Sequence, residues 1–213
     1  AARLMAVLHP LKVVLTNWDA DKTLTLTVEN HPKHPEMGSH TVTFGKELYI
    51  EQEDFMEVPA KKFQRMYPGF EVRLNGAYIV KCEGCKKDEN GNVTEVYCTV
   101  DMDSLSGSEG ADRKIKGKTL HWVSAADAVP FEARLYDPLL ADDSALEDEA
   151  EPTAEDAVDA EETEEAEEAD ANLSRADYDF LKKLNQHSLT VVRGVIEPYA
   201  KECARGTALQ FLR

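Results

Sequence analysis

Short stretches in which apolar and polar residues alternate recur along the first quarter of the chain. Residues 11–18 form an apolar run, residues 23–28 alternate threonine and leucine, and residues 41–44 and 47–50 alternate again. A period of two is typical of a β-strand with one buried face. The pattern therefore predicts four strands, the last two joined through residues 45–46 as a tight hairpin.

Further strands are expected along most of the chain. Residues 71–83 are predicted to form a long strand with a partner over 93–100, because the Asn-Gly pair between them is a strong hairpin signal. Four further strands are expected over residues 118–123, 130–135, 188–196 and 207–211. Many short strands with regular turns predict an all-β fold of barrels or sandwiches.

The residue pattern of two other segments predicts helices instead of strands. Apolar residues spaced by three and five over residues 54–66 predict a short helix that is interrupted near Pro59. A second helix is expected over residues 173–184, because Ser174 resembles an N-cap. The expected fold is therefore all-β with short helices.

Cations alternate with aromatic residues over residues 61–73. Lysine and arginine neutralise phosphates, and Phe63, Tyr67 and Phe70 offer faces on which unpaired bases stack. The same composition also fits a solvated helix that is followed by a turn and a strand. Residue types alone leave both interpretations open.

The net charge of −17 is concentrated in one segment. Residues 141–170 contain sixteen Asp and Glu and no Lys or Arg, which leaves 25 acidic against 24 basic residues elsewhere. A polyanion responds to the local field of a patch, so the charge of the whole chain does not exclude nucleic acid. Residues 141–172 are too acidic and too poor in apolar side chains to fold, so we expect a disordered insertion.

The remaining candidate chemistry is sparse. No stretch has the apolar length of a membrane helix, and the N-terminal residues lack the charged and apolar regions of a signal peptide. Four cysteines do not make a disulfide framework, so a cytoplasmic protein is expected. Neither the histidine group (His31, His34 and His40) nor the cysteine group (Cys82, Cys85 and Cys98) shows a complete set of zinc ligands, so we expect no metal site. Catalytic sequence motifs are also absent.

Four groups of residues together resemble the anticodon-binding region of glutaminyl-tRNA synthetase. They are Ala-Arg-Leu-Met-Ala-Val at 2–7; Asn-His-Pro at 30–32 with Pro-Glu-Met-Gly-Ser at 35–39; Glu-Val-Arg-Leu at 71–74; and Lys-Gly at 116–117 leading into His-Trp-Val-Ser-Ala at 121–125 and Arg-Leu-Tyr-Asp at 134–137. They occur in the family's order and spacing. The resemblance spans nearly the whole chain except the acidic segment.

The resemblance implies two six-stranded barrels in tandem. Residues 1–52, 126–140 and 173–213 would form the proximal barrel, residues 53–125 the distal barrel, and residues 141–172 the acidic insertion. The family's closing strands would lie beyond residue 213, so an incomplete proximal barrel is expected.

The family's catalytic domain precedes this region, so the resemblance implies no catalytic residue and no cofactor here; ATP and magnesium serve the parent enzyme. The implied partners are the anticodon loop of tRNA(Gln) and the catalytic domain of the same polypeptide, in a monomer.

The resemblance also assigns base-reading roles. Arg3 and Gln210 match residues around the middle anticodon base, a uridine, and Arg65 matches the reader of the third base, a guanosine. Arg73 matches a residue at the first base. The planar guanidinium group suits these roles because it engages a base edge bidentately. Lys61 and Lys62 are expected to contact phosphates.

Three positions depart from the family. Asn75 stands where a second arginine near the first base is common, Gln64 replaces a lysine, and Leu212 replaces a glutamate near the middle-base pocket. Both Gln64 and Asn75 stay in the predicted RNA-binding set. Three large aromatic residues are assigned to the core instead: Trp122, Tyr136 and Phe211.

Alternatives remain within and outside this family. The archaeal or eukaryotic type of glutamyl-tRNA synthetase shares the fold and would require cytidine at the third anticodon base. A stand-alone barrel protein would bind ribosomal RNA. A protein-interaction module would use the acidic segment to recruit basic partners.

Overall fold

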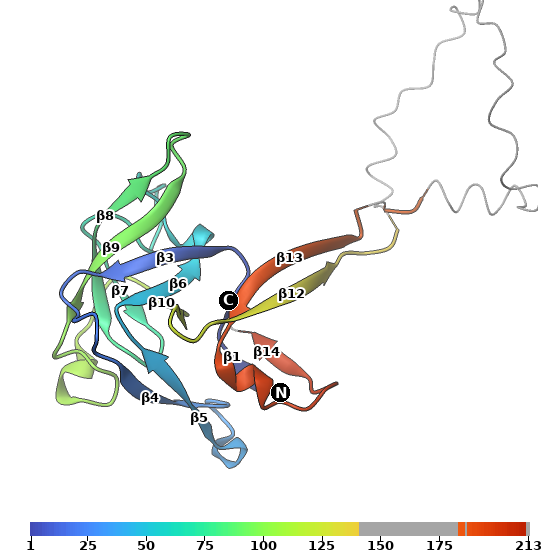
Figure 1. Cartoon of the computed structure of the whole chain (residues 1–213), viewed down its shortest axis with the longest axis horizontal. Helices are drawn as coiled ribbons and strands as arrows, with labels where there is room; N and C mark the ends of the chain where they lie inside the picture. Colours follow the sequence, from blue (N-terminus) through green and yellow to red (C-terminus); the bar gives the residue numbers. More distant parts are fainter. Residues whose placement is uncertain (141–182, 186, 212–213) are drawn as a thin grey trace, which may run out of the picture. The chain divides into compact units, whose positions relative to one another are not determined.

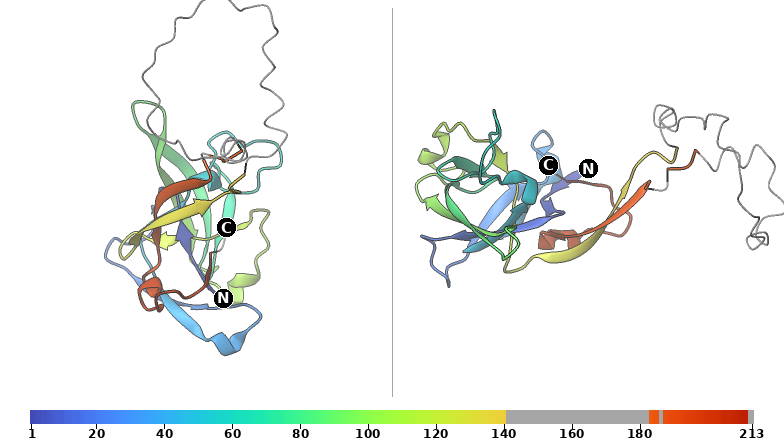
Figure 2. Two further views of the ribbon diagram at one scale, coloured as in Figure 1. Left: turned by 90° about the vertical axis from the view of Figure 1, so that its right-hand side faces the viewer. Right: turned by 90° about the horizontal axis from the view of Figure 1, so that it is seen from above.

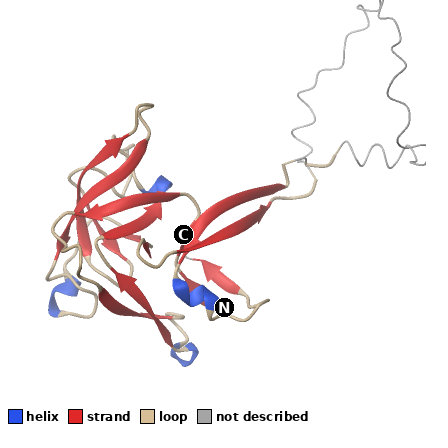
Figure 3. Cartoon of the chain, viewed as in Figure 1, coloured by secondary structure: helices blue, strands red, loops and turns tan. Residues whose placement is uncertain are grey.

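The computed structural model describes residues 1–140, 183–185 and 187–211, and these are mostly β-strands (Figures 1 and 3). The described helical turns are all short 3-10 turns: η1 (Pro35–Met37), η2 (Gln52–Asp54), η3 (Glu109–Asp112) and η5 (Pro198–Lys201). The prediction of an all-β fold is therefore confirmed. No helix among the described residues is long and apolar enough to cross a membrane.

The largest sheet has seven strands in the order β10-β7-β8-β9-β3-β6-β11 (Figure 1). Two of its pairings, β3 with β9 and β10 with β7, are parallel, and the others are antiparallel. The strands are β3 (Pro10–Leu15), β6 (Glu47–Glu51), β7 (Glu71–Leu74), β8 (Ile79–Lys87), β9 (Val93–Asp101), β10 (Thr119–Leu120) and β11 (Val123–Ser124). The predicted hairpin across Asn90 and Gly91 is confirmed as β8 and β9.

Three smaller sheets hold the other strands (Figure 2). β4 (Leu24–Glu29) pairs with β5 (Ser39–Phe44), and β1 (Ala2–Leu4) pairs in parallel with β14 (Leu209–Phe211). The third sheet has the order β12-β13-β2 and contains β12 (Val129–Tyr136), β13 (Leu189–Ile196) and β2 (Ala6–Val7). The first and last described strands of the chain are therefore neighbours.

Contacts divide the chain into a main unit, residues 1–133 and 192 onward, and a second unit, residues 134–191. In the second unit the described residues form a ribbon: Asp137 N donates to Ser188 O at 2.9 Å and Asn185 N to Leu139 O at 2.8 Å. The predicted insertion at 141–172 and residues 173–182 of the predicted helix lie outside the described residues.

The core of the main unit is built around an aromatic cluster. Phe44 packs against Trp18 at 4.9 Å, Trp122 at 5.2 Å and Tyr78 at 5.3 Å between ring centroids. Along β3 the apolar residues at alternate positions are buried, as the period of two predicts. Trp122 is a core residue, as expected. The same expectation is wrong for Tyr136, which is 74% exposed, and for Phe211, which is 46% exposed.

The predicted hairpin at residues 45–46 is wrong. β5 pairs with β4, whereas β6 pairs with β3 and β11, so the chain crosses between two sheets at Gly45. The carbonyl of Lys46 accepts a hydrogen bond from Leu15 N at 2.8 Å. The turn is therefore held by β3 and not by a partner strand across the hairpin.

The long strand predicted over 71–83 is divided into β7 and β8 by a turn at Asn75 and Gly76. Gly76 has a φ of 67°, which glycine adopts without steric cost. Asn-Gly is itself a hairpin signal, so the sequence contained the evidence for this turn. The strand predicted over 118–123 is likewise divided into β10 and β11.

The helix predicted over 54–66 is wrong. Met66 N donates to Asp54 O at 2.8 Å and Met56 N to Met66 O at 3.0 Å, so the two ends of the segment pair with each other around a loop. Val58 is 83% exposed, which a buried helix face would not allow. The fixed φ of Pro59 and the positive φ of Lys62 (70°) both oppose a continuous helix.

Residues assigned to two different barrels lie in one sheet of this structure. β3 and β6 come from residues assigned to the proximal barrel, and β7 to β10 come from residues assigned to the distal barrel. The number of strands in each barrel and the predicted boundaries stay a prediction.

We expect Gly117→Ala to reduce the free energy of unfolding by about 1–3 kcal/mol, the usual range for overpacking. A Cβ at Gly117 would lie 1.9 Å from the backbone oxygen of Glu71, so the segment leading into β10 would have to move away from β7. Urea unfolding measures the change. Gly45→Ala is the matched control, because its Cβ would meet nothing within 4 Å. Equal loss in both variants would contradict the close packing at Gly117.

Candidate nucleic-acid interface

The two residues predicted at the middle base are direct neighbours. Parallel pairing of β1 with β14 sets Arg3 opposite Gln210, and Arg3 Nε donates to Gln210 Oε1 at 3.2 Å. The two positions are 207 residues apart, and both side chains are exposed enough to reach solvent. The structure therefore brings together a pair that the sequence connected only through the family resemblance.

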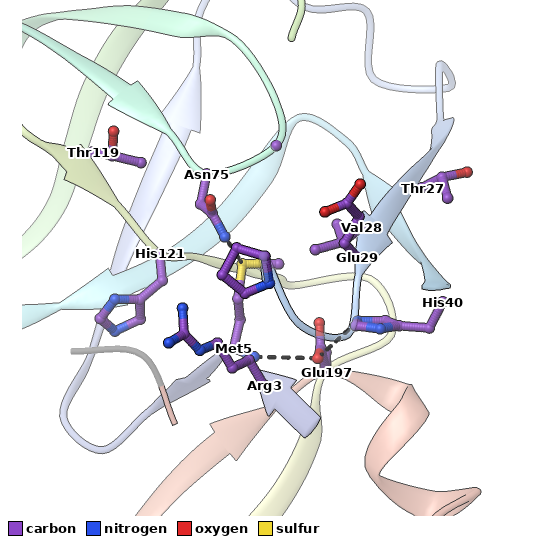
Figure 4. Close-up of a pocket in the computed structure, with 12 residues that line it drawn as sticks. Arg3, Met5, Thr27, Val28, Glu29, His40, Asn75, Thr119, His121 and Glu197 are labelled. Carbon is purple, nitrogen blue, oxygen red and sulfur yellow. Dashed lines mark hydrogen bonds and ion pairs between the residues drawn. The ribbon is translucent and has the colours of Figure 1, made fainter. Parts of the chain in front are cut away.

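Arg3 also lines a cavity of 490 Å³ within the main unit (Figure 4). Asn75 lines the same cavity from the turn between β7 and β8, and its carbonyl accepts a hydrogen bond from Trp122 Nε1 at 3.0 Å. Figure 4 shows the Arg3 guanidinium on the side of the cavity where Asn75 and His121 lie. Two predicted RNA-binding residues, Arg3 and Asn75, therefore line one cavity, and a third, Gln210, is hydrogen-bonded to Arg3.

A buried polar network forms another wall of this cavity. Glu197 Oε1 accepts a hydrogen bond from Met5 N at 3.1 Å and lies 3.0 Å from His40 Nε2. His40 Nδ1 lies 2.6 Å from Asn30 Oδ1, and the His40 ring stacks on Tyr199 at 4.4 Å. Glu197 and His40 are only 2% and 5% exposed.

The network fixes the backbone next to Arg3. Arg3 N donates to Asn30 O at 2.8 Å, and Glu197 N donates to Met5 O at 3.2 Å. Sequence reasoning missed Glu197 and considered His40 only as a metal ligand. A buried His–Glu contact between positions 157 apart has no local pattern, so no sequence signal marked it.

Arg65, predicted at the third base, is held by an ion pair. Its Nη1 lies 2.6 Å from Oδ1 of Asp54, whose side chain is 5% exposed. Burial raises the pKa of Asp54 above its ordinary value, and the positive charge of Arg65 opposes that shift. The Arg65 side chain itself is 40% exposed, so the ion pair holds a guanidinium that is still accessible to a ligand.

Arg73, predicted at the first base, is bound by backbone carbonyls. Nη1 donates to Ser104 O at 3.2 Å and Nη2 to Ala111 O at 2.6 Å. These bonds tie β7 to the loop that follows β9. Neither Arg65 nor Arg73 pairs with Glu57 or Glu71, the surface partners that the sequence offered; those carboxylates bind Lys87 and Arg113.

The remaining predicted contacts lie on the loop before β7. Lys61, Lys62 and Gln64 are exposed, and the Gln64 carbonyl accepts a hydrogen bond from Lys118 N at 2.9 Å. Tyr67 and Phe70 stack on each other at 4.3 Å with an interplanar angle of 16°. The two rings are half-buried, which supports their interpretation as packing beneath the basic residues.

The cysteines are free thiols and do not form one cluster. Cys82 and Cys98 face each other on β8 and β9, and both are buried. The hydrogen bond to Cys82 raises the pKa of Cys98 well above its ordinary value, and burial adds to this shift. Among the described residues no group of three His, Cys, Asp or Glu side chains is arranged to hold a metal ion.

Family models and individual relatives both relate this chain to tRNA synthetases. Family models described as tRNA synthetases class I (E and Q), anti-codon binding domain, match residues 1–101 and 119–213. The chain is 44% identical over 213 residues to a glutamine–tRNA ligase of Clostridium perfringens and 40% identical over 213 residues to one of Vibrio vulnificus. Each match covers 100% of this chain and 33% of the relative, so the chain spans about a third of their length.

We expect Glu197→Ala to reduce the free energy of unfolding by about 1–3 kcal/mol, because Met5 N and His40 would lose a buried partner. Urea unfolding measures the loss. Glu202→Ala removes the same charge from an exposed site nearby and should change stability by less than about 0.5 kcal/mol. A Glu197 variant as stable as the Glu202 variant would show that the network contributes nothing.

Asp54→Asn should change how stability depends on pH. Since the folded pKa of Asp54 is raised, the folded chain binds a proton more tightly than the unfolded chain, and stability falls as pH rises through the folded pKa. The free energy of unfolding of the parent chain minus that of the variant should therefore decrease between about pH 3 and pH 7.

Asp88→Asn provides a control of opposite sign. Hydrogen bonds from Asn92 lower the pKa of Asp88, so its contribution is present above the unfolded pKa and lost as pH falls. The corresponding difference should increase with pH. If both differences had the same sign, burial would not be the main influence on Asp54.

Proposed function

Because the chain belongs to the anticodon-binding domains of the class I tRNA synthetases for glutamate and glutamine, we propose that it recognises the anticodon loop of tRNA(Gln). It does so as part of a longer glutamine–tRNA ligase, the name that its similar relatives carry. The parent enzyme attaches glutamine to tRNA(Gln) with ATP and magnesium. On this proposal, catalysis and the binding of ATP and magnesium belong to the rest of the polypeptide.

The observation that carries this proposal is the meeting of Arg3 and Gln210 beside a cavity that Asn75 also lines. A concave site with a few convergent polar groups is the usual form of a small-ligand pocket. An unstacked base is small enough to enter such a pocket. Arg3 contributes guanidinium N–H donors, and Gln210 contributes an amide with both a donor and an acceptor. The donors of Arg3 and Gln210 match the carbonyl oxygens of a uridine, and the amide oxygen of Gln210 matches its ring N–H.

The third base would meet Arg65. Its ion pair with Asp54 restricts the guanidinium before RNA arrives, so less conformational entropy is lost on binding. A guanosine presents O6 and N7 acceptors to such a group, whereas a cytidine presents an amino donor. A guanidinium that Asp54 holds in place would therefore favour guanosine over cytidine at the third base.

The first base would lie near Arg73 and Asn75. Arg73 uses two of its donors on backbone carbonyls, so it shapes the surface by holding the loop that follows β9. Asn75, in place of a second arginine, contributes an uncharged amide with both a donor and an acceptor. Tolerance of cytidine or uridine at this base would then depend on that amide.

The larger organisation is part of the same proposal. Two tandem six-stranded barrels, with the proximal one completed by further residues of the polypeptide, would insert the three bases into separate pockets. Correct binding would be coupled to the catalytic domain of the same chain, in a cytoplasmic monomer. Binding experiments distinguish this proposal from three alternatives: a glutamyl-tRNA synthetase, a barrel that binds ribosomal RNA, and a protein-interaction module.

The proposal predicts that the chain prefers an anticodon stem-loop with guanosine at the third base over the same stem-loop with cytidine. Arg65→Ala should remove about 1–3 kcal/mol of that preference, the usual value of one good base contact. Arg65→Lys keeps a positive charge beside Asp54 but lacks the guanidinium fork, so it should also lose the preference. Fluorescence titration of both stem-loops measures the difference.

Arg193→Ala is the matched control, because it removes an exposed arginine from β13. It should keep the preference for guanosine. A preference for cytidine would identify the glutamyl type of synthetase. Tighter binding to a ribosomal RNA helix than to either stem-loop would favour the ribosomal alternative.

A further inference from the structure

Two basic segments lie against each other, although the sequence analysis considered only one of them. Residues 61–65 and 113–118 contain seven lysines and arginines and no acidic residue. Lys118 N donates to Gln64 O at 2.9 Å, which joins the two segments directly. Gly117 lets the second segment pack closely on the start of β7, since a Cβ there would meet the Glu71 backbone and the Phe70 ring.

We propose that Lys114, Lys116 and Lys118, together with Lys61 and Lys62, form a contact surface for RNA phosphates next to the base-reading residues. We call these five lysines the lysine surface. The inference rests on the proposed function, because the RNA that reaches this surface is the one whose bases enter the cavity. It adds three residues to which the family resemblance gave no role.

Exposure along the second segment shows which side chains reach solvent. Lys114, Lys116 and Lys118 are exposed, whereas the intervening Ile115 and Gly117 are half-buried. The three lysine side chains therefore reach solvent, and the residues between them face the protein more.

The five lysines form no ion pair with the carboxylates of the neighbouring described segments. Three of those carboxylates have other partners: Asp54 binds Arg65, Glu57 binds Lys87 and Glu71 binds Arg113. Within the described part of the chain, the five lysines take part in none of the ion pairs found. Unpaired lysines attract a polyanion and release its counterions on binding, which is the main source of phosphate affinity.

Arg113 has a different role from the lysines that follow it. It binds both carboxylate oxygens of Glu71, at 2.9 and 3.0 Å, and Asp101 at 2.8 Å. These bonds fix the start of the segment against β7 and β9. Arg113 is therefore a positioning residue and not a phosphate contact.

The lysine surface continues into the candidate base site. Directly after Lys118, Thr119 pairs with Arg73 across β10 and β7 and lines the cavity with Arg3 and Asn75 (Figures 1 and 4). Gln64, the hydrogen-bond partner of Lys118, precedes Arg65. An RNA strand whose bases meet Arg3 and Arg65 would have its backbone within reach of these lysines. Lysine is a flexible point charge, which suits phosphate rather than base recognition.

The test replaces Lys114, Lys116 and Lys118 by alanine in the full chain and measures binding of both stem-loops over a range of salt concentrations. We expect both affinities to fall by the same factor, with the preference for guanosine unchanged. The slope of log K against log salt should become shallower by about two to three, since each phosphate contact contributes about 0.9 on a duplex. The replaced side chains are exposed, so the urea midpoint should not change.

A control variant removes the same charge elsewhere: Lys22→Ala, Lys86→Ala and Lys201→Ala, all exposed positions. An equal change of slope in the control would overturn the proposal, because net charge alone would then explain the effect. Weakening of only one stem-loop would also overturn it, since the lysines would then read bases. Polyglutamate that binds the parent chain as tightly as RNA, and loses that affinity in the triple variant, would indicate an acidic protein partner instead.

The outcomes separate this inference from the proposed function. An unchanged slope in the triple variant, while Arg65→Ala still removes the preference for guanosine, would overturn the lysine surface alone. A shallower slope without any preference for an anticodon would support the lysine surface and overturn anticodon recognition.

Discussion

The buried carboxylate of Glu197 is the interaction on which the candidate site depends. It accepts a hydrogen bond from Met5 N and contacts His40, so it joins the end of β13 to the β1–β2 segment and to β5. A buried carboxylate that lost these partners would be costly, which makes the arrangement specific. Arg3, two residues before Met5, is thereby placed at the cavity opposite Gln210. In its proposed role at the middle base, Arg3 would then start from a fixed backbone, which lowers the cost of ordering it on binding.

The arginines show two ways of restricting a guanidinium. Asp54 binds Arg65 through one ion pair and leaves it partly exposed, whereas Ser104 and Ala111 engage both terminal nitrogens of Arg73. The first arrangement orients a group for a ligand, and the second uses the group to hold a loop. The guanidinium performs both tasks because it has five donors in a rigid plane.

Charge is organised locally and not by the total of −17. Many surface cations of the described residues are paired, as Lys12 is with Glu47, but the five lysines of the lysine surface are not. An RNA strand responds to the field of that surface within about a Debye length, roughly 8–10 Å at moderate salt. A chain with a strongly acidic composition can therefore offer a basic face.

The sequence by itself determined most of the strand segments and, through the family resemblance, which residues are candidates for reading bases. Alternation located β4, and the Asn-Gly turn signal located β9, because both signals are carried by residues close together in the chain. Only the tertiary structure decided which strands pair. β5 leaves the predicted hairpin for β4, and β3 pairs in parallel with β9 from far along the chain. The tertiary structure also decided that Glu197 contacts His40, that Asp54 pairs with Arg65, and that the two basic segments are joined by a hydrogen bond. Each of these contacts joins positions whose spacing carries no periodic signal, and packing of the whole core brings them together.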